Sequence, residues 1–441
     1  AIMSFFLAVL LVILGTYLLF NAGTTVVLQL LKKKKNYYYK PNNMISTSNL
    51  VFRMKKNAVG LATIAILSSM VLVTLVGAAS IYAGKKDYLA SVAPYDYSVT
   101  GTNVDLTSTE KIMDDFLEQS GNQVNEKAEV TYLYFGIKEQ ENNKLTIFPE
   151  NERKVLPKSI FLVFSQATYK QLTGKDLNLA SNQVGLYSKS KTLKDQKSLS
   201  FNGQTYQIQD DINDFIKGKV PNIFTIIVSE YNYLVVPDMD DFKESVKGTA
   251  TTQATYVGVN VKDPTHDAKK NSDLLDQMTD KETQQLAGHT TGVSQSYLTA
   301  NSQYDTEGML NGFVGGTFFI GIFLSIIFML GTVLVIYYKQ ISEGYEDRER
   351  FVILQKIGLD DLQVKQTIRK QVLTVFFLPL IFAFIHLAFA YHMLSLIVRI
   401  IGVFNPSLML VVTIIVCGVF FLAYVLVFAL TSRSYRRIVS M

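Results

Sequence analysis

The sequence lacks the features that would define a soluble metalloenzyme, an ATPase or a disulfide-stabilised domain. It has no Trp and a single Cys, Cys417, so no disulfide can form within the chain. It contains no GxxxxGK(S/T) motif, and the Gly84-Lys85 and Gly218-Lys219 pairs lack the spacing and the hydroxyl residue of that phosphate-binding loop. The four His residues form no HExxH motif or ligand-like group. We therefore expect this chain to have no catalytic residues, no metal site and no cofactor of its own.

What the sequence has instead is long apolar runs. The chain has 441 residues, of which 49% are hydrophobic and 18% charged. Runs of about eighteen or more apolar residues are typical of membrane-spanning helices. At about 1.5 Å per residue, each run can cross a hydrocarbon core of about 30 Å. The five predicted spans are Ile2–Leu28, Ala58–Ala83, Gly312–Tyr338, Val372–Val398 and Leu408–Leu430.

Charge is divided unevenly along the chain. Residues 84–308 contain 23 Lys/Arg and 31 Asp/Glu, a net charge of −8, whereas the rest contains 19 Lys/Arg and 6 Asp/Glu, a net charge of +13. Lys and Arg gather between the first two spans, after the third span and in the tail, which predicts that these segments are cytoplasmic. Residues 84–308 are then extracellular. The charge pattern thus indicates topology, and it gives no reason to expect a nucleic-acid partner.

The predicted fold class is α-helical transmembrane, with five spans in this chain, plus a large extracellular α+β domain. The first transmembrane helix is expected at 1–31, followed by a basic cytoplasmic loop with an interfacial elbow helix at 32–57 and a second transmembrane helix at 58–83. The extracellular domain occupies 84–308, the third transmembrane helix 309–338 and a cytoplasmic coupling loop 339–371. Transmembrane helices at 372–398 and 408–430 are joined by an extracellular turn at 399–407, and a cytoplasmic tail follows at 431–441.

The segment 84–308 alternates strand-like and helical patterns. Two short strand-like runs flank Asn202-Gly203, a dipeptide that strongly favours a two-residue β-hairpin turn. Helices are expected at Ser108–Gln119, Asp240–Lys247 and Ala268–Leu286. This mixture predicts an α+β domain of one or two lobes. Its acidic excess would attract cationic ligands over a Debye length of about 8–10 Å.

Two charged clusters in this segment are candidate sites. The carboxylates of Asp210, Asp211 and Asp214 form a candidate surface for cationic peptides. The ammonium groups of Lys217 and Lys219 flank Gly218 at an expected turn, where they could hold a phosphate or a partner's carboxylates. A solvated acidic surface and an ordinary charged turn remain the alternatives.

Two cytoplasmic segments have amphipathic patterns. In residues 343–371 we expect a helix, a Gly turn and a second helix, which either dock a cytoplasmic partner or merely connect two spans. The candidate docking residues are Arg350, Phe351, Ile353, Leu354, Ile357 and Gly358. Residues 49–57 have the character of an interfacial helix, which we expect to turn upward into the second span at residues 57–60. The candidate elbow residues are Asn49, Leu50, Arg53, Lys55 and Asn57.

These two segments resemble parts of a known superfamily. Ile353-Leu354-x-x-Ile357-Gly358 resembles the cytoplasmic loop of FtsX-like permeases, and Asn49-Leu50-x-x-Arg53-x-Lys55-x-Asn57 is similar to the elbow that opens each of their repeats. One large domain placed before the last three spans is similar to the layout of Bce-type peptide-resistance permeases, which have ten spans. The resemblance covers essentially the whole chain and depends mostly on this layout. It implies that the chain is the C-terminal part of a longer permease.

The resemblance also implies a function and partners. The function would be sensing of, and resistance to, cationic antimicrobial peptides and cell-wall antibiotics, with Lys217, Gly218 and Lys219 in a ligand-sensing loop. A cytoplasmic ABC ATPase subunit, expected in two copies that bind ATP and Mg, would dock on residues 343–371 and pass motion to the outer domain by mechanotransmission. A membrane histidine kinase would read transporter activity. The implied ligands are cationic antimicrobial peptides or lipid-linked cell-wall precursors, and the implied setting is the lipid of a Gram-positive cell membrane.

Two other functions remain open from the sequence. A membrane receptor or adaptor would bind ligand through the outer domain without a transport cycle. A lipoprotein-releasing or division-type permease would transmit motion to an external partner, although such relatives usually have four spans and another domain placement. The predicted spans contain almost no charged residues, which disfavours an ion-coupled transporter and points to energy supplied by a partner.

Overall fold

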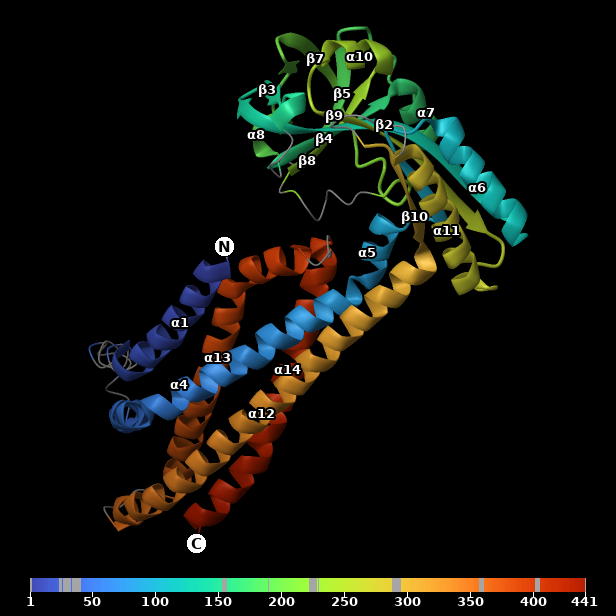
Figure 1. The fold of residues 1–441 in the computed structure, drawn as a ribbon. Coiled ribbons are helices and arrows are strands. Elements are labelled where there is room, and N and C mark those ends of the chain that lie inside the picture. Colours follow the sequence, from blue (N-terminus) through green and yellow to red (C-terminus); the bar gives the residue numbers. More distant parts are fainter. Residues whose placement is uncertain are drawn as a thin grey trace. The chain divides into compact units, whose positions relative to one another are not determined.

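The computed structural model describes residues 2–23, 26, 33, 41–152, 157–188, 190–221, 228, 230–287, 295–356, 361–400 and 405–440. Only the backbone is described at several helix ends, notably residues 41–56, 349–356, 361–372 and 432–440. The chain divides into two compact units (Figure 1). The helical unit comprises Ala1–Ala83, Gly315–Val398 and Asn405–Met441. The sheet domain comprises Gly84–Val314 and Arg399–Phe404.

Long helices make up the helical unit. They are α1 (Ile2–Leu18) with the π-helical η1 (Leu19–Gly23), α4 (Pro41–Ala83), α12 (Gln303–Lys356), α13 (Asp361–Ile400) and α14 (Pro406–Ser440). Within the described residues, four segments are long and apolar enough to cross a membrane: Asn57–Ala83, Gln303–Glu346, Phe376–Arg399 and Pro406–Thr431. Leu7–Gly23 is a shorter apolar helix. Four of the five predicted spans therefore correspond to helices of sufficient length, and the count of five stays a prediction.

Helix α4 runs without a break through the predicted elbow and the second predicted span. Its helical backbone continues from Pro41 to Ala83, so the turn expected at residues 57–60 does not separate two helices. Helix α12 is also long, with 54 residues that extend past its apolar part to Lys356. The next helix, α13, begins at Asp361, and the predicted Gly358 turn lies outside the described residues.

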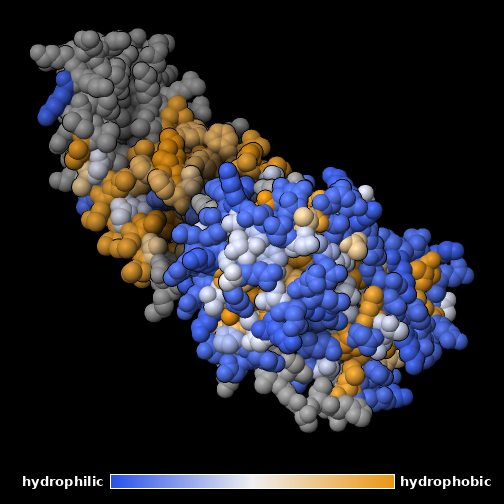
Figure 2. Space-filling model, turned by 90° about the horizontal axis from the view of Figure 1, so that it is seen from above, coloured by the Kyte–Doolittle hydropathy of each residue, from blue (hydrophilic) through white to orange (hydrophobic). Residues whose placement is uncertain are grey.

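Apolar side chains on α4, α12, α13 and α14 pack into one core of the helical unit. Within it the ring centroids of Phe376 and Tyr424 are 5.1 Å apart, and the Tyr424 hydroxyl donates a 2.8 Å hydrogen bond to the Phe376 carbonyl. The outward sides of α12 and α14 expose Leu, Ile and Phe residues, and Figure 2 shows hydrophobic residues over the surface of this unit. Such faces suit lipid tails or further apolar helices.

The described part of the sheet domain contains ten strands and several helices. The strands are β1 (Tyr97–Thr102), β2 (Val124–Glu141), β3 (Lys144–Ile147), β4 (Ser159–Ser165), β5 (Gln183–Ser188), β6 (Ser198–Phe201), β7 (Gln204–Asp211), β8 (Glu230–Val236), β9 (Thr251–Val261) and β10 (Tyr297–Ser302). The helices are α5 (Lys85–Val92), α6 (Leu106–Ser120), α7 (Gln166–Thr173), α8 (Lys191–Lys194), α10 (Met239–Ser245) and α11 (Ala268–Ala287), with a 3-10 turn η2 at Glu150–Glu152.

Strand β2 organises the sheet, whose order is β10-β1-β9-β2-β3-β6-β7-β5-β8-β4. Because β4 pairs again with β2, seven strands from β2 to β4 form a closed ring of pairings. Alternate residues of a strand point to opposite faces. Accordingly Leu133 and Phe135 belong to one core cluster, whereas Val130 and Tyr132 belong to another. Both faces of this part of the sheet are therefore buried.

The other end of the sheet is covered by two helices, α6 and α11, which pack with β1, β9 and β10 around a third apolar cluster (Figure 1). Tyr97 and Phe116 meet there with ring centroids 5.1 Å apart. The predicted hairpin at Asn202-Gly203 is confirmed by the antiparallel pairing of β6 and β7. The predicted helix at Ala268–Leu286 is confirmed as α11.

Candidate functional site

Helices α4 and α12, which precede and follow the sheet domain in the chain, form a close pair within the helical unit. A Cβ atom placed on Gly321 would lie 2.4 Å from the Cβ of Ala78, and one on Gly331 would lie 3.5 Å from Leu67 Cδ1. Residue numbers fall along α4 as they rise along α12, so the two helices are antiparallel. Small residues allow such close approach between helices in a membrane.

Polar side chains join the same two helices at the N-terminal end of the α4 span. The Lys339 ammonium donates a 2.8 Å hydrogen bond to the Asn57 carbonyl, and the Asn57 side-chain amide donates to the Glu343 carboxylate. Lys339 Nζ lies 2.8 Å from where a Cβ on Gly60 would be. We call Asn57, Gly60, Lys339 and Glu343 the polar joint. Lys339 and Glu343 are four residues apart and so share one face of α12.

The polar joint includes only one residue that the sequence had suggested, Asn57. The other predicted elbow residues lie on α4 where only the backbone is described: Asn49, Leu50, Arg53 and Lys55. The predicted docking residues Arg350, Phe351, Ile353 and Leu354 lie on α12, again with only the backbone described, and Ile357 and Gly358 lie outside the described residues. Sequence reasoning placed Gly60 only at the end of the expected turn, and it did not select Lys339 or Glu343 as candidate site residues. A Lys and a Glu four residues apart at the end of an apolar run could have indicated them.

In the sheet domain, the two lysines of the predicted sensing loop have different surroundings. Gly218 has φ of 74°, a left-handed conformation that favours Gly. Lys217 is exposed, whereas the Lys219 ammonium donates to the Leu172 carbonyl in the last turn of α7. A cation at a helix C-terminus stabilises carbonyls that lack intrahelical partners. Lys219 therefore supports α7 directly, and Lys217 is the lysine of this loop that faces solvent.

The three predicted aspartates are also separated by the fold. Asp210 and Asp211 end β7, where they pair with Gly185 and Leu186 of β5. Asp214 follows in the next turn and is half-buried, and its Oδ1 atom is buried without a hydrogen-bond partner among the described residues. Burial raises the pKa of the Tyr187 hydroxyl, and the Asp214 carboxylate raises it further. Of the three side chains, only that of Asp214 is described, and it is half-buried rather than fully exposed.

His386 lies within a predicted span and bonds to side chains of two other helices. Its Nδ1 atom is 3.0 Å from the Ser69 hydroxyl on α4, and its Nε2 atom is 3.4 Å from the Thr16 hydroxyl on α1. His386 thus lies where α13 meets α1 and α4. Among the described residues, no group of three or more His, Cys, Asp or Glu could hold a metal ion.

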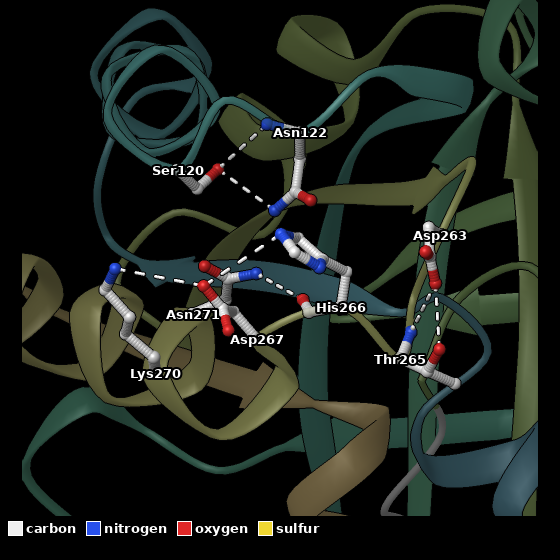
Figure 3. A network of polar contacts seen from close by, with 8 residues as sticks. All are labelled: Ser120, Asn122, Asp263, Thr265, His266, Asp267, Lys270 and Asn271. Atoms are coloured by element: carbon white, nitrogen blue, oxygen red, sulfur yellow. Dashed lines mark hydrogen bonds and ion pairs between the residues drawn. The ribbon is translucent and has the colours of Figure 1, made fainter.

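A polar network around His266 in the sheet domain stabilises a turn and provides no site. Figure 3 draws polar contacts between the end of β9 and the start of α11, together with a separate contact of Ser120 with Asn122 at the end of α6. The Asn271 amide donates a 3.1 Å hydrogen bond to the His266 carbonyl, and the Thr265 hydroxyl donates to Asp263, which lowers the pKa of that carboxyl. The His266 side chain is 74% exposed and lies 4.0 Å from Asp267. Its role is local.

Long apolar helices, two of which flank an inserted sheet domain, define a multi-pass membrane protein without a recognisable catalytic centre in the described residues. The chain is 25% identical over 396 residues to the ABC transporter permease protein YxdM of Bacillus subtilis (strain 168), covering 88% of this chain. It is 24% identical over 392 residues to the bacitracin export permease protein BceB of the same organism, covering 86%. It is 22% identical over 402 residues to BceB of Halalkalibacterium halodurans. No protein-family model matches the chain.

The named relatives are ABC transporter permeases, and the similarity to them extends over 86–88% of this chain. The chain spans 58% of the length of YxdM and 55% of the length of either BceB protein. Each relative therefore has a large part that this chain does not cover.

Proposed function

We propose that the chain is the sheet-domain-bearing part of a permease subunit in a Bce-type ABC transporter that senses and confers resistance to cationic antimicrobial peptides and cell-wall antibiotics. The observation that carries this proposal is the similarity, over 86–88% of the chain, to permeases of which two are named bacitracin export permeases. The paired helices α4 and α12 support it, because they connect the helical unit to both ends of the sheet domain.

In this proposal a partner supplies the energy and the helices carry motion. Two copies of a cytoplasmic ATPase subunit bind ATP and Mg and dock on residues 343–371. Movement passes along α12 and α4 to the sheet domain, which lies outside the membrane of a Gram-positive cell. The sheet domain engages cationic peptides or lipid-linked cell-wall precursors, and a membrane histidine kinase reads the transporter's state.

The proposed sensing elements are the acidic surface of the sheet domain and the loop around Gly218. The net charge of −8 in residues 84–308 attracts cationic peptides. Lys217, Gly218 and Lys219 form the loop, in which the exposed Lys217 contacts the ligand and Lys219 holds the loop to α7. Asp210 and Asp211 are the nearby carboxylates at the end of β7.

Co-purification of the tagged permease with its soluble ATPase tests the docking part of the proposal. Deletion of residues 346–362 should abolish the pairing, because it removes the end of α12 and the start of α13. Removal of residues 433–441, a segment predicted to lie on the same side of the membrane, is the control and should leave the pairing intact. Retained pairing in the 346–362 deletion would contradict the docking assignment. A receptor without a transport cycle would instead signal normally when ATP hydrolysis by the partner is inactivated.

A further inference from the structure

We propose that the polar joint of Asn57, Gly60, Lys339 and Glu343 sets the register of α4 and α12, that is, their translation and rotation relative to each other. A movement of α12 at residues 343–356, just beyond the joint, would then be passed to α4. The direction of that movement rests on the proposed function above. The register itself follows from contacts within the helical unit and does not depend on a partner.

Apolar packing alone fixes the register of two helices only weakly in a membrane, because lipid tails replace apolar side chains at little cost. The contacts of Ala78 with Gly321 and of Leu67 with Gly331 are of this kind. Hydrogen bonds between helices are directional, so they specify both rotation and translation. In the described α4–α12 contacts, the joint supplies such bonds at one end of the pair.

Gly60 is part of the joint because it makes room for the Lys339 ammonium. A Cβ atom at this position would meet Lys339 Nζ at 2.8 Å. Ala is otherwise favoured over Gly inside a helix. Gly60→Ala should therefore displace the flexible lysine head from the Asn57 carbonyl and leave α4 helical.

The side chains around the polar joint are compatible with more than one position of α12 relative to α4. The Asn57 and Glu343 side chains are half-buried, and Ala58 and Leu61 beside them are 4% and 1% exposed. Gln340, the residue after Lys339, is 7% exposed, and neither its amide nitrogen nor its oxygen has a hydrogen-bond partner among the described residues. A buried amide without a partner is unfavourable. If α12 shifted relative to α4, the amide nitrogen and oxygen of Gln340 could form hydrogen bonds that they lack among the described residues in this arrangement.

Disulfide cross-linking in the full permease, in membranes and with Cys417→Ser as background, tests the register. Leu67→Cys and Gly331→Cys place a reporter pair at a remote contact of the same helices. Asn57→Ala and Gly60→Ala should each slow cross-linking roughly three- to twenty-fold, the range that one hydrogen bond between membrane helices supports. Gly418→Ala, at a position with nothing within 4 Å, is the control and should not change the rate. Equal rates in wild type and joint variants would overturn the proposal.

The same reporter measured with the partner ATPase tests the coupling. If ATP changes the cross-linking rate in the wild type, Asn57→Ala should reduce that change while co-purification with the ATPase persists. An unreduced response to ATP in this variant would overturn the coupling role. A wild type that pairs with the ATPase but shows no response to ATP would count against the proposed function, and the measurement without ATPase would still decide whether the joint sets the register.

Discussion

At the residue scale, side-chain caps determine where the helices of the sheet domain begin. Asp105 caps α6 by accepting a 2.8 Å hydrogen bond from the Ser108 backbone amide, and the Ser108 hydroxyl donates to its other oxygen. Ser165 caps α7 in the same way through the Thr168 amide. These bonds satisfy backbone amides that have no partner within the helix.

The cap of α6 gives a prediction about stability and pH. Asp105→Ala removes the acceptor and should cost about 1 kcal/mol at neutral pH, which would speed amide exchange in α6 on the order of fivefold. The bonds from Ser108 lower the pKa of Asp105. A carboxylate with a lowered folded pKa stabilises above its unfolded pKa and loses that effect as pH falls through the folded value.

The difference between wild type and Asp105→Ala should therefore shrink in acid, below the ordinary Asp range near about 4. Hydrogen exchange measured by mass spectrometry checks both points. Glu118→Ala, an exposed change on the same helix, is the control. Equal exchange of α6 in wild type and Asp105→Ala at neutral pH would show that the cap has no effect.

At the element scale, the α4–α12 pair combines close packing along its apolar part with polar contacts at one end. At Gly321 the two helices approach closely, because an added Cβ would lie 2.4 Å from Ala78 Cβ. Ser325, one turn further along α12, is 4% exposed, and its hydroxyl donates to the Gly321 carbonyl. The pair therefore has little room for a larger side chain at this point.

Gly321→Ala should destabilise the helical unit although Ala favours helices. The new methyl group would force the helices apart, and overpacking of about 1–3 kcal/mol corresponds to a melting temperature lower by roughly 3–10 °C. Gly316→Ala on the same helix, with nothing within 4 Å, is the matched control. Thermal unfolding in detergent measures both variants. If the two melt at the same temperature, the close contact at Gly321 does not contribute to stability.

Elements with a local sequence signal could be predicted, and elements that depend on distant partners could not. Apolar length indicated four long helices, and Asn202-Gly203 indicated the β6–β7 hairpin. The start of α6 was placed at Ser108, but the helix begins at Leu106, because the cap is Asp105 and Ser108 is its donor. No local sequence pattern indicates the pairing of β2 with β4 that closes the ring of strands, so this pairing could not be predicted.

The contacts of the candidate site could not be predicted from the sequence either, because they join residues far apart in the chain. Asn57 was selected from an elbow pattern, but its partners Lys339 and Glu343 lie 282 and 286 residues away in the chain. Their spacing indicates a shared helix face and says nothing of which helix they meet. From the sequence, Lys217 and Lys219 could not be told apart either, because the contact of Lys219 with the Leu172 carbonyl depends on the packing of α7.

At the scale of the whole molecule, the acidic segment lies in the sheet domain, and the long apolar runs lie in the helical unit. The segment 84–308 has a net charge of −8, whereas the remaining residues have a net charge of +13 and contain the long apolar helices. The sheet domain is joined to the helical unit through α4 and α12, which are themselves in contact. Charge and hydropathy therefore mark nearly the same boundary along the chain as the division into two units.

The most direct test of the central claim is the rate of ATP hydrolysis by the full permease and its partner ATPase in liposomes, measured with and without bacitracin and a Lys-rich amphipathic peptide. If the sheet domain is coupled to hydrolysis through α4 and α12, at least one peptide should change the rate, and Asn57→Ala should reduce that change. The change should weaken as salt rises if the acidic surface captures the peptide. A rate that is the same with and without every peptide, in a complex that binds its ATPase, would contradict the account.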